Sequence, residues 1–460
     1  MDSNNSAPMR LTPQSIGRAI DATGSTKMTW GLVIVAGFGV FFDVFDNSLI
    51  SLCLPFMKKE FDLNVQSVGY IGSAGMIGMA LGSYLSGWIS DHLGRIRVFA
   101  IMLAIFSVFT GVTALCATAG LLMLARVVAG FGLGGLIPLA TLAVAEAVPT
   151  RSRGAMIGWV GLAGGIGAVL ASIIGKALIV NVGWRMMFFI GVFPIIIAVI
   201  GKLLIPESPR WLSMRGRDAD AAKSLERFGV TEAALAKAVE ETKEEAAAAG
   251  QPKPKIGDLF ARGMKSRVIF NWLITIFIQF SMVGFNMFAT TIFMNNYHLQ
   301  ASIALSIMIY FSLAQLAGRL VAVPILDMIG RKLTLIIACI GACIAPVLIL
   351  MSPTEAVLIG ATLLIGFCSA PMVNAVTAIS SELYPQHIRG LGTSMAMGMG
   401  RLAGALAPAM FGWILAGGSV NGIWIVISAI CLVGAVLTMV MGVETKGRSL
   451  EETGKATAKA

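Results

Sequence analysis

The chain has 460 residues, of which 57% are hydrophobic and 13% are charged, and its formal net charge is +10. Soluble domains carry roughly 25% charged residues, so this composition excludes a soluble globular protein and indicates a chain that lies largely within a lipid bilayer. The positive charge does not indicate a nucleic-acid partner, because lysine and arginine are concentrated in alternate segments between long apolar runs.

Apolar runs of membrane-spanning length begin at residue 30 and continue almost to the C-terminus. A helix needs about 20 apolar residues to cross a bilayer, and these runs do not alternate with period two, which excludes a transmembrane β-barrel. The sequence therefore predicts an all-α membrane protein with twelve transmembrane helices. The expected spans are 30–54, 67–88, 97–116, 121–144, 155–180, 185–205, 268–294, 302–326, 332–352, 355–380, 392–416 and 421–443.

Polar segments divide the chain into two bundles of six helices each. The start of the chain has no short apolar stretch followed by a cleavage site, so it is not expected to be a secretory signal. Under the positive-inside rule both termini and the middle loop face the cytoplasm, in the inner membrane of a bacterium. The middle loop contains a segment around 233–249 that favours a helix, ended by Gly250-Gln251-Pro252. The expected parts are an N-terminal tail at 1–29, a bundle at 30–207, the loop at 208–267, a second bundle at 268–443 and a C-terminal tail at 444–460.

The two halves of the chain match each other at a constant offset of 236 positions. The offset places Asp91, Gly94 and Arg95 on Asp327, Gly330 and Arg331; Gly130, Phe131 and Thr141 on Gly366, Phe367 and Thr377; and Glu146, Pro149, Arg153 and Gly154 on Glu382, Pro385, Arg389 and Gly390. Three separated windows on one offset indicate an internal duplication, so the halves share a fold and an orientation. Parallel six-helix halves with a site between them are one architecture that supports alternating access.

Two loop segments resemble the signature of the major facilitator superfamily, and the resemblance covers nearly the whole chain. They are Gly87-Trp88-Ile89-Ser90-Asp91-His92-Leu93-Gly94-Arg95-Ile96-Arg97 and its repeat Asp327-Met328-Ile329-Gly330-Arg331-Lys332. Glycine permits a tight turn, and aspartate accepts hydrogen bonds from helix N-termini or arginines. We therefore expect a latch at the cytoplasmic side that breaks when this side opens, with solvated loop charges as the alternative. Its expected members are Asp91, Gly94, Arg95, Arg97, Asp327 and Arg331.

Two glutamates mark the cytoplasmic ends of the fourth and tenth spans. Glu146 and Glu382 can pair with loop arginines such as Arg153 and Arg389 when the inner gate is closed. We expect these four residues to take part in gating.

Within the superfamily, Pro206-Glu207-Ser208-Pro209-Arg210-Trp211-Leu212 and Glu444-Thr445-Lys446-Gly447-Arg448 are similar to segments of both sugar porters and organic-ion transporters. Sugar porters have paired glutamines before a Gly-x-Asn in helix seven, where this chain has Phe280 and Ser281. Aromatic-acid:proton symporters and related organic-anion carriers are the better match. Their motifs resemble Asp43-Val44-Phe45-Asp46, with valine in place of glycine, and Gly398-Met399-Gly400-Arg401-Leu402-Ala403, with the last glycine displaced to Gly404.

Ionisable groups deep in a bilayer are costly and usually functional. Asp43 and Asp46 lie near the middle of the first span, three residues apart on one helix face, and carboxylates so close do not ionise independently. We predict that Asp46, with Asp43, carries a coupling proton. Arg126 resembles the superfamily's fourth-helix arginine and is expected to help release that proton. A structural ion pair, for instance between Asp43 and Arg126, is the alternative.

Arg401 lies near the centre of the eleventh span, between Gly398, Gly400 and Gly404, which leave space around it. Its guanidinium stays charged and matches a carboxylate with two parallel bonds, so its partner is either a substrate or a carboxylate on another helix. Arg319, nearer the cytoplasmic end of the eighth span, is expected to join a latch or to extend toward the membrane surface. The expected pocket residues are Gln279, Phe285, Asn286, Tyr310, Phe367 and Asn374, although each could equally serve helix packing.

The sequence does not support other chemistry. Its six cysteines lie in or beside apolar segments, and neither a G-x-S-x-G nor an H-E-x-x-H motif occurs, so we expect no enzyme, no metal site and no cofactor apart from the proton as coupling ion. The expected partners are a small organic anion and the lipid bilayer, and the expected state is a monomer. The leading hypothesis is proton-coupled import of a small, aromatic carboxylate by alternating access. The alternative is transport of a neutral metabolite such as a sugar or polyol, or drug export.

Overall fold

The computed structural model describes residues 11–245, 256–260, 264–384 and 388–444. Within these ranges the chain is helical and contains no strand. Twelve segments of the described chain are long and apolar enough to cross a membrane. The predicted all-α class and the number of spans are therefore confirmed.

The first bundle contains α2 to α8 and begins at a capped helix start. The side chain of Thr26 accepts a hydrogen bond from the backbone N–H of Thr29 at 3.3 Å, which satisfies one of the unpaired donors at the start of α2. The expected sixth span is divided into α7 and α8, since Pro194 occupies the first turn of a new helix. The bounds are α2 (Lys27–Glu60), α3 (Val65–Leu93), α4 (Arg95–Leu115), α5 (Ala119–Ala147), α6 (Thr150–Asn181), α7 (Trp184–Ile190) and α8 (Pro194–Leu204).

The second bundle contains α12 to α17 and repeats the first. Gly94 and Gly330 occupy the equivalent turns before α4 and α14, with φ of +107° and +93°. Side chains rarely adopt this backbone region, which explains why both turns use glycine. The bounds are α12 (Lys265–Asn295), α13 (Ala301–Ile329), α14 (Arg331–Met351), α15 (Glu355–Glu382), α16 (Arg389–Ala416) and α17 (Val420–Met441).

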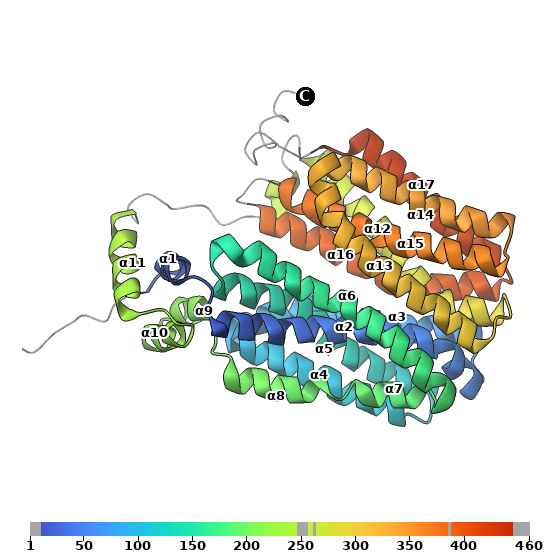
Figure 1. Ribbon diagram of the computed structural model, residues 1–460, viewed down its shortest axis with the longest axis horizontal. Helices are drawn as coiled ribbons and strands as arrows, with labels where there is room; N and C mark the ends of the chain where they lie inside the picture. Colours follow the sequence, from blue (N-terminus) through green and yellow to red (C-terminus); the bar gives the residue numbers. More distant parts are fainter. Residues whose placement is uncertain (1–10, 246–255, 261–263, 385–387, 445–460) are drawn as a thin grey trace, which may run out of the picture.

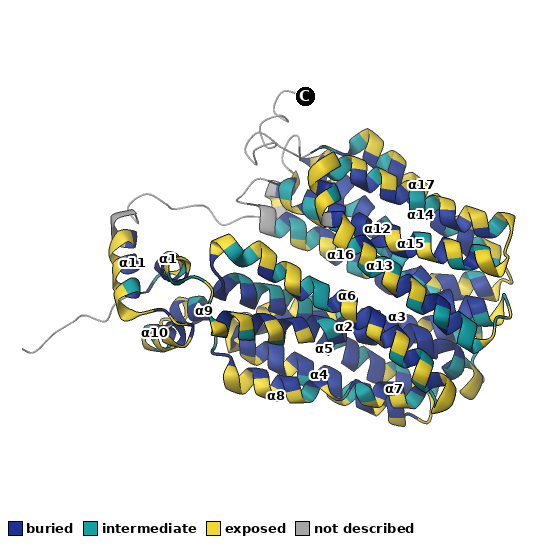
Figure 2. Cartoon of the chain, viewed as in Figure 1, coloured by how far each residue is buried: buried dark blue, intermediate teal, exposed yellow. Residues whose placement is uncertain are grey.

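Close packing inside the bundles depends on small residues. Gly78, Gly82, Gly130 and Gly134 bring α3 and α5 together, because a Cβ at any of them would collide with the backbone of the facing helix. Such small-residue contacts hold helices together in lipid, where the hydrophobic effect between helices is weak. The outer faces of both bundles carry many exposed residues (Figure 2). Large apolar side chains such as Leu124, Leu203 and Trp413 are among the exposed residues. The outer faces are therefore suited to contact lipid.

A third group of helices lies at one end of the bundles (Figure 1). Its members are α1 (Pro13–Thr23), α9 (Pro209–Met214), α10 (Asp218–Arg227) and α11 (Glu232–Glu245). Apolar side chains from these helices form a small core of their own, including Ile16, Ile20, Trp211, Leu225 and Val239. The Asp21 carboxylate attaches this group to the first bundle by accepting hydrogen bonds from the backbone N–H and the hydroxyl of Thr150, at 2.6 and 2.9 Å.

The segments expected as tail and loop thus contain packed helices. The N-terminal tail includes α1, which is amphipathic and buries one face against α9 and α11. The expected charged helix around residues 233–249 is observed as α11, while the following Gly250-Gln251-Pro252 lies outside the described residues. A short 3-10 helix, Ile256–Phe260, precedes the second bundle.

The most extensive contacts between the two bundles in the described chain are those of α2 with α12, α3 with α16, and α6 with α13. We call the end that carries α1 and α9 to α11 the charged end, because the turns at Gly94 and Gly330 with their arginines also lie there. Ser51 Oγ donates to the carbonyl of Asn286, and Ser73 Oγ accepts from the backbone N–H of Ala409 at 3.0 Å. Both bonds lie nearer the end opposite the charged end. They hold the two bundles together there.

Candidate substrate and coupling site

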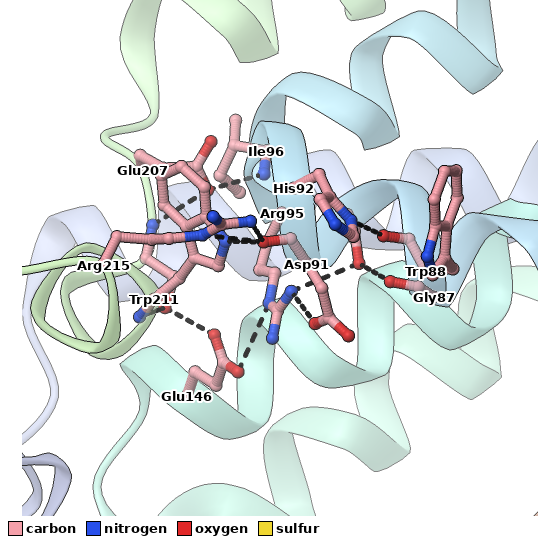
Figure 3. Close-up of polar contacts among 12 residues, drawn as sticks. Gly87, Trp88, Asp91, His92, Arg95, Ile96, Glu146, Glu207, Trp211 and Arg215 are labelled. Atoms are coloured by element: carbon pink, nitrogen blue, oxygen red, sulfur yellow. Dashed lines mark hydrogen bonds and ion pairs between the residues drawn. The ribbon is translucent and has the colours of Figure 1, made fainter.

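A charged cluster lies at the charged end of the first bundle (Figure 3). Arg95 Nη1 lies 2.5 Å from Asp91 Oδ1, and its Nε lies 3.5 Å from Glu146 Oε1. The indole N–H of Trp211 and the guanidinium of Arg215 both donate to the backbone carbonyl of Asp91, at 2.8 and 2.6 Å. The helices of the third group therefore fix the loop that carries the first signature segment.

The second bundle repeats this cluster in a looser form. Arg331 Nη1 lies 3.4 Å from Asp327 Oδ1, and its Nη2 lies 3.2 Å from Glu382 Oε1. The side chain of Arg331 is 19% exposed, compared with 6% for Arg95. The duplication read from the sequence is thus visible as the same three side chains in each bundle.

Two further glutamates complete these clusters and were not among the predicted gating residues. Glu207 accepts a hydrogen bond from the backbone N–H of Ile96 at 2.9 Å, near the start of α4. Glu444 accepts one from the backbone N–H of Arg331 at 3.0 Å, at the start of α14. Carboxylates favour helix N-termini because unpaired N–H groups and the helix dipole meet there. The sequence signal was present, since each glutamate begins or lies within a segment that supported the family resemblance.

Among the described residues, the ion pairs of Arg95 and Arg331 at this end lie within one bundle rather than between the two. Arg153 donates to Thr150 Oγ1 at 3.3 Å and is not the partner of Glu146. Burial and the nearby Arg153 lower the pKa of Arg210, and Glu146 and Asp21 oppose that shift. A latch across the bundles stays a prediction.

The remaining gating candidates lie at the same end. The Arg97 side chain is exposed, and the Arg389 side chain lies outside the described residues.

Asp46 and Arg126 form a buried ion pair inside the first bundle. Arg126 Nη1 donates to Asp46 Oδ1 at 3.0 Å and Nη2 donates to Oδ2, a two-pronged pairing. The two side chains are 1% and 3% exposed, and Arg126 also lies 5.7 Å from the ring centroid of Phe188. The predicted coupling residues therefore meet, but the arginine binds Asp46 and not Asp43, because the crossing of α2 and α5 places Asp46 opposite it.

Asp43 is buried beside this pair without a comparable partner. Its side chain is 3% exposed, and its Oδ1 has no hydrogen-bond partner among the described residues. Asp43 interacts electrostatically with Arg401 on α16 of the other bundle. It thus connects the first-bundle carboxylates to the predicted substrate arginine.

A central cavity of about 260 Å³ lies between the bundles. Four methionines line this cavity, and their flexible side chains give it an adaptable apolar surface. They are Met76, Met79, Met282 and Met287. The cavity's amide and guanidinium groups come from both bundles, and they are Asn47, Gln279, Asn286, Gln315, Arg319 and Asn374. Three of the predicted pocket residues, Gln279, Asn286 and Asn374, are therefore brought together.

A second cavity of about 240 Å³ adjoins the first and contains Arg401. Gln279 and Val373 line both cavities, so the two are neighbours across these side chains. Arg401 Nη1 reaches the carbonyl of Gly134 on α5 at 3.5 Å, at the long limit for a hydrogen bond. No ion pair joins Arg401 to a carboxylate in the described part of the chain. The guanidinium thus faces a cavity with most of its bonding capacity unused.

The glycines around Arg401 serve helix packing rather than clearing space for its side chain. A Cβ at Gly398 would collide with the hydroxyl of Tyr84, and one at Gly400 would lie 2.9 Å from Gln279 Cγ. The first contact is with α3 and the second with α12. The glycines therefore bring α16 against both neighbours and place Arg401 beside the cavity.

The aromatic candidates line neither cavity. Phe285 is buried, with its ring centroid 5.4 Å from that of Phe311. Tyr310 is 46% exposed on the face of α13 that also exposes Leu313, and Phe367 is 38% exposed. Their predicted contact with substrate has no support in this arrangement and stays a prediction.

Arg319 takes a different position from the one expected. It lines the central cavity, and its Nη1 donates to the carbonyl of Gly161 on α6 at 3.4 Å, across the two bundles. Gln315, one turn away, lines the same cavity and donates to Ser369 Oγ at 3.2 Å. The four-residue spacing of these two polar side chains within an apolar span was the available signal.

The described residues contain no group of three histidine, cysteine, aspartate or glutamate side chains that could hold a metal ion. The six cysteines are free thiols, and four of them come from neighbouring helices α14, α15 and α17. The polar side chains that line the two cavities include guanidinium groups and amides.

Comparison with known proteins identifies the relatives of this arrangement. The family model described as Sugar (and other) transporter matches residues 30–456. The niacin transporter NiaP of Acinetobacter baylyi is 29% identical over 437 residues, which cover 93% of this chain and 97% of the relative. A cis,cis-muconate transport protein of the same organism is 26% identical, with 87% and 91% covered.

Solved structures agree with the fold. The inward open conformation of the xylose transporter XylE from E. coli matches with a TM-score of 0.75 at 21% identity, covering 93% of this chain and 100% of that chain. Both six-helix bundles are therefore arranged as in that structure, and the predicted architecture is confirmed.

Proposed function

The chain belongs to the family of sugar (and other) transporters within the major facilitator superfamily, and from this premise we propose that it imports a small organic carboxylate together with protons. As a member of this family it is a membrane transporter and not an enzyme. The proposal adds a substrate class, a coupling ion and a direction. The charged end faces the cytoplasm in this proposal, as the positive-inside rule requires.

Arg401 is the observation that supports the substrate class most strongly. It faces a cavity between the bundles, and a backbone carbonyl at 3.5 Å is its hydrogen-bond acceptor among the described residues. A charged group within a membrane protein needs a strong partner, and a carboxylate fits the planar guanidinium with two parallel bonds. A substrate anion supplies the partner.

The Asp46–Arg126 pair supports proton coupling. A carboxylate that is ion-paired and buried cannot hold a proton and Arg126 at the same time in this geometry, so protonation of Asp46 would break the pair. Asp46 is on α2 and Arg126 on α5, and each helix contributes residues to one of the two cavities, so breaking the pair loosens two helices that border the site. The unpaired Asp43 relays the change toward Arg401 through their electrostatic interaction.

The transport cycle follows from these contacts. In the outward-facing state Asp46 takes a proton and the substrate carboxylate binds Arg401. The bundles then rock, the charged end opens, and Arg126 regains Asp46 as the proton leaves. The described contacts between bundles at the opposite end match an arrangement that is open at the charged end. The relatives named for niacin and muconate transport, both carboxylates, favour this class.

A neutral metabolite is the second candidate. Gln279, Asn286, Asn374 and Gln315 give the central cavity several amides, and amides bind hydroxyl groups as donors and acceptors. In that case Arg401 has a structural role, and binding survives its replacement.

A thermal-shift screen of the purified protein separates the two candidates. The probes are benzoate, nicotinate and hexanoate as acids, xylose as a sugar, and tetraethylammonium as a cation, each at acidic and slightly alkaline pH. A bound ligand raises the unfolding temperature by mass action. We expect stabilisation by the carboxylates, stronger at acidic pH because substrate and proton bind together.

The Arg401→Gln variant is the matched control for this screen. We expect it to unfold as the wild type does without ligand and to lose the carboxylate shift. Stabilisation by xylose alone, unchanged in the variant, would replace the proposal with the sugar candidate.

A further inference from the structure

Arg319 is a second cation in the cavity region that the proposed cycle does not use. Its stem passes over Gly165 of α6, where a Cβ would lie 3.4 Å from Arg319 Cδ. Its Nη1 donates to the carbonyl of Gly161 at 3.4 Å, while its Nε has no hydrogen-bond partner among the described residues. Like Arg401, it comes from the second bundle and reaches a backbone carbonyl of the first. It therefore has capacity to bind an anion.

The two arginines lie at different sides of one interior region. Arg319 belongs to α13, which packs against α6, whereas Arg401 belongs to α16, which packs against α3. Between them, Gln279 lines both the central cavity and the Arg401 cavity. A ligand that extends past Gln279 can thus present one end to each guanidinium. Ligand pockets have volumes of roughly 300–1,000 Å³, so each cavity of about 260 or 240 Å³ holds part of such a ligand.

Charge balance favours a ligand with two negative ends. The ionisable residues deep in the described spans are three arginines, Arg126, Arg319 and Arg401, and two aspartates, Asp43 and Asp46. When one aspartate carries the coupling proton, three positive and one negative charge remain, a formal charge of +2. A monoanion leaves +1, whereas a dianion leaves zero. Unbalanced charge is costly in the membrane interior, so the loaded carrier is most readily closed around a dianion.

We propose that the site recognises a dicarboxylate, with one carboxylate on Arg401 and the other on Arg319. This inference rests on the proposed function, because it uses the proton and the Arg401 contact. It adds Arg319 as the residue that distinguishes dicarboxylates from monocarboxylates. A compact unsaturated or aromatic spacer between the two carboxylates fits the methionine-lined wall.

Matched pairs of acids test the proposal by isothermal titration of the purified full chain. Terephthalate and benzoate differ by one carboxylate on the same ring, and muconate and sorbate differ by one on the same six-carbon chain. We expect each diacid to bind the wild type about 10-fold to 100-fold more tightly than its monoacid, as an added bond to a charged group provides. Arg319→Gln should remove this preference and leave monoacid binding within about twofold.

The variants separate failure of this inference from failure of the proposed function. Arg401→Gln should lose both members of each pair. If monoacids bind through Arg401 but Arg319→Gln leaves the diacid preference intact, the dicarboxylate inference is wrong and the proposed function stands. If no acid binds the wild type, both are wrong.

Two further variants distinguish a specific role of Arg319 from a general effect of misfolding. Arg319→Lys keeps the charge and should retain a reduced diacid preference, because an ammonium cannot reproduce the planar fork. Leu313→Met, on the exposed face of the same helix, should bind all four acids as the wild type does. Loss of the diacid preference in Leu313→Met would contradict a specific role for Arg319.

Discussion

The interiors of the two bundles hold their charges differently. In the first bundle Arg126 and Asp46 bind each other through two bonds and are almost completely buried. In the second bundle Arg401 and Arg319 reach only backbone carbonyls of the opposite bundle among the described residues, at 3.5 and 3.4 Å. The same fold therefore contains one half with an internal ion pair and one half with unbalanced cations.

From this difference in ion pairing we infer different roles for the two halves, although they derive from one repeat. A self-contained ion pair can be opened and closed by a proton without a ligand. In the proposed cycle, cations that form no ion pair among the described residues take an anion from outside, and this couples ligand binding to closure of the bundles. The charged clusters at the ends, in contrast, are nearly equivalent in both halves.

Breaking the first-bundle pair is expected to have the largest effect on stability. Arg126→Leu leaves Asp46 buried without its partner and should lower the free energy of unfolding by about 3–5 kcal/mol. Thermal unfolding in detergent, followed by tryptophan fluorescence, measures this loss. The double variant Asp46→Asn, Arg126→Leu should recover part of it, since no unpaired charge remains. An Arg126→Leu protein as stable as the wild type would show that the pair contributes nothing.

Replacing the second-bundle arginine should affect binding instead of stability. Arg401→Gln removes a cation that forms no ion pair among the described residues and interacts with Asp43 only through space, so we expect an unfolding temperature close to that of the wild type. Carboxylate affinity should fall by about 10-fold to 100-fold, as expected for loss of a charge-assisted pair. Titration with benzoate or terephthalate measures this. A large loss of stability without ligand would mean that Arg401 is held by the protein itself.

The charged end offers a smaller contrast between the halves. Glu207→Gln and Glu444→Gln each weaken the cap of a helix, α4 or α14, and such caps contribute about 0.5–2 kcal/mol. Glu207 also lies beside the helices that bind the Asp91 carbonyl. These contacts should keep the start of α4 in place when the Glu207 carboxylate is removed. We expect the larger drop in unfolding temperature for Glu444→Gln. Equal drops would show that the third group of helices adds no support.

The smallest effects are expected at the exposed aromatic residues. Tyr310→Phe and Phe367→Leu change side chains that line neither cavity, so carboxylate affinity should change less than about twofold, within the range of ordinary surface substitutions. A clear loss of affinity in either variant would contradict this prediction and would indicate that the residue contacts substrate in another state of the transport cycle.

Much of the fold could be predicted from the sequence, because membrane-spanning helices are set by length and apolarity alone. The duplication could also be predicted from the sequence, since one offset aligns the Asp91 and Asp327 segments. The packed helix α1 was not expected, because 11 residues in a polar segment give no membrane signal and its partners lie about 200 residues away. Only the folded arrangement pairs Leu11 with Ser213.

The site was less predictable because it depends on the rotation and crossing of helices. Asp43 and Asp46 share a helix face, and only the position of α5 decides that Arg126 binds Asp46. Arg319 was expected to join a latch or to extend toward the membrane surface, whereas its direction toward the cavity follows from the packing of α13 on α6. Glu207 and Glu444 escaped the repeat comparison because they are 237 positions apart, one more than the common offset.

Uptake into proteoliposomes tests the central division of tasks most directly. The assay compares wild type, Asp46→Asn and Arg401→Gln with a labelled carboxylate identified by the binding screen, once as exchange at equal pH and once with an inward proton gradient. We predict that Asp46→Asn keeps exchange but loses gradient-driven accumulation, whereas Arg401→Gln loses both. Accumulation by Asp46→Asn, or exchange of the carboxylate by Arg401→Gln at the wild-type rate, would contradict the account.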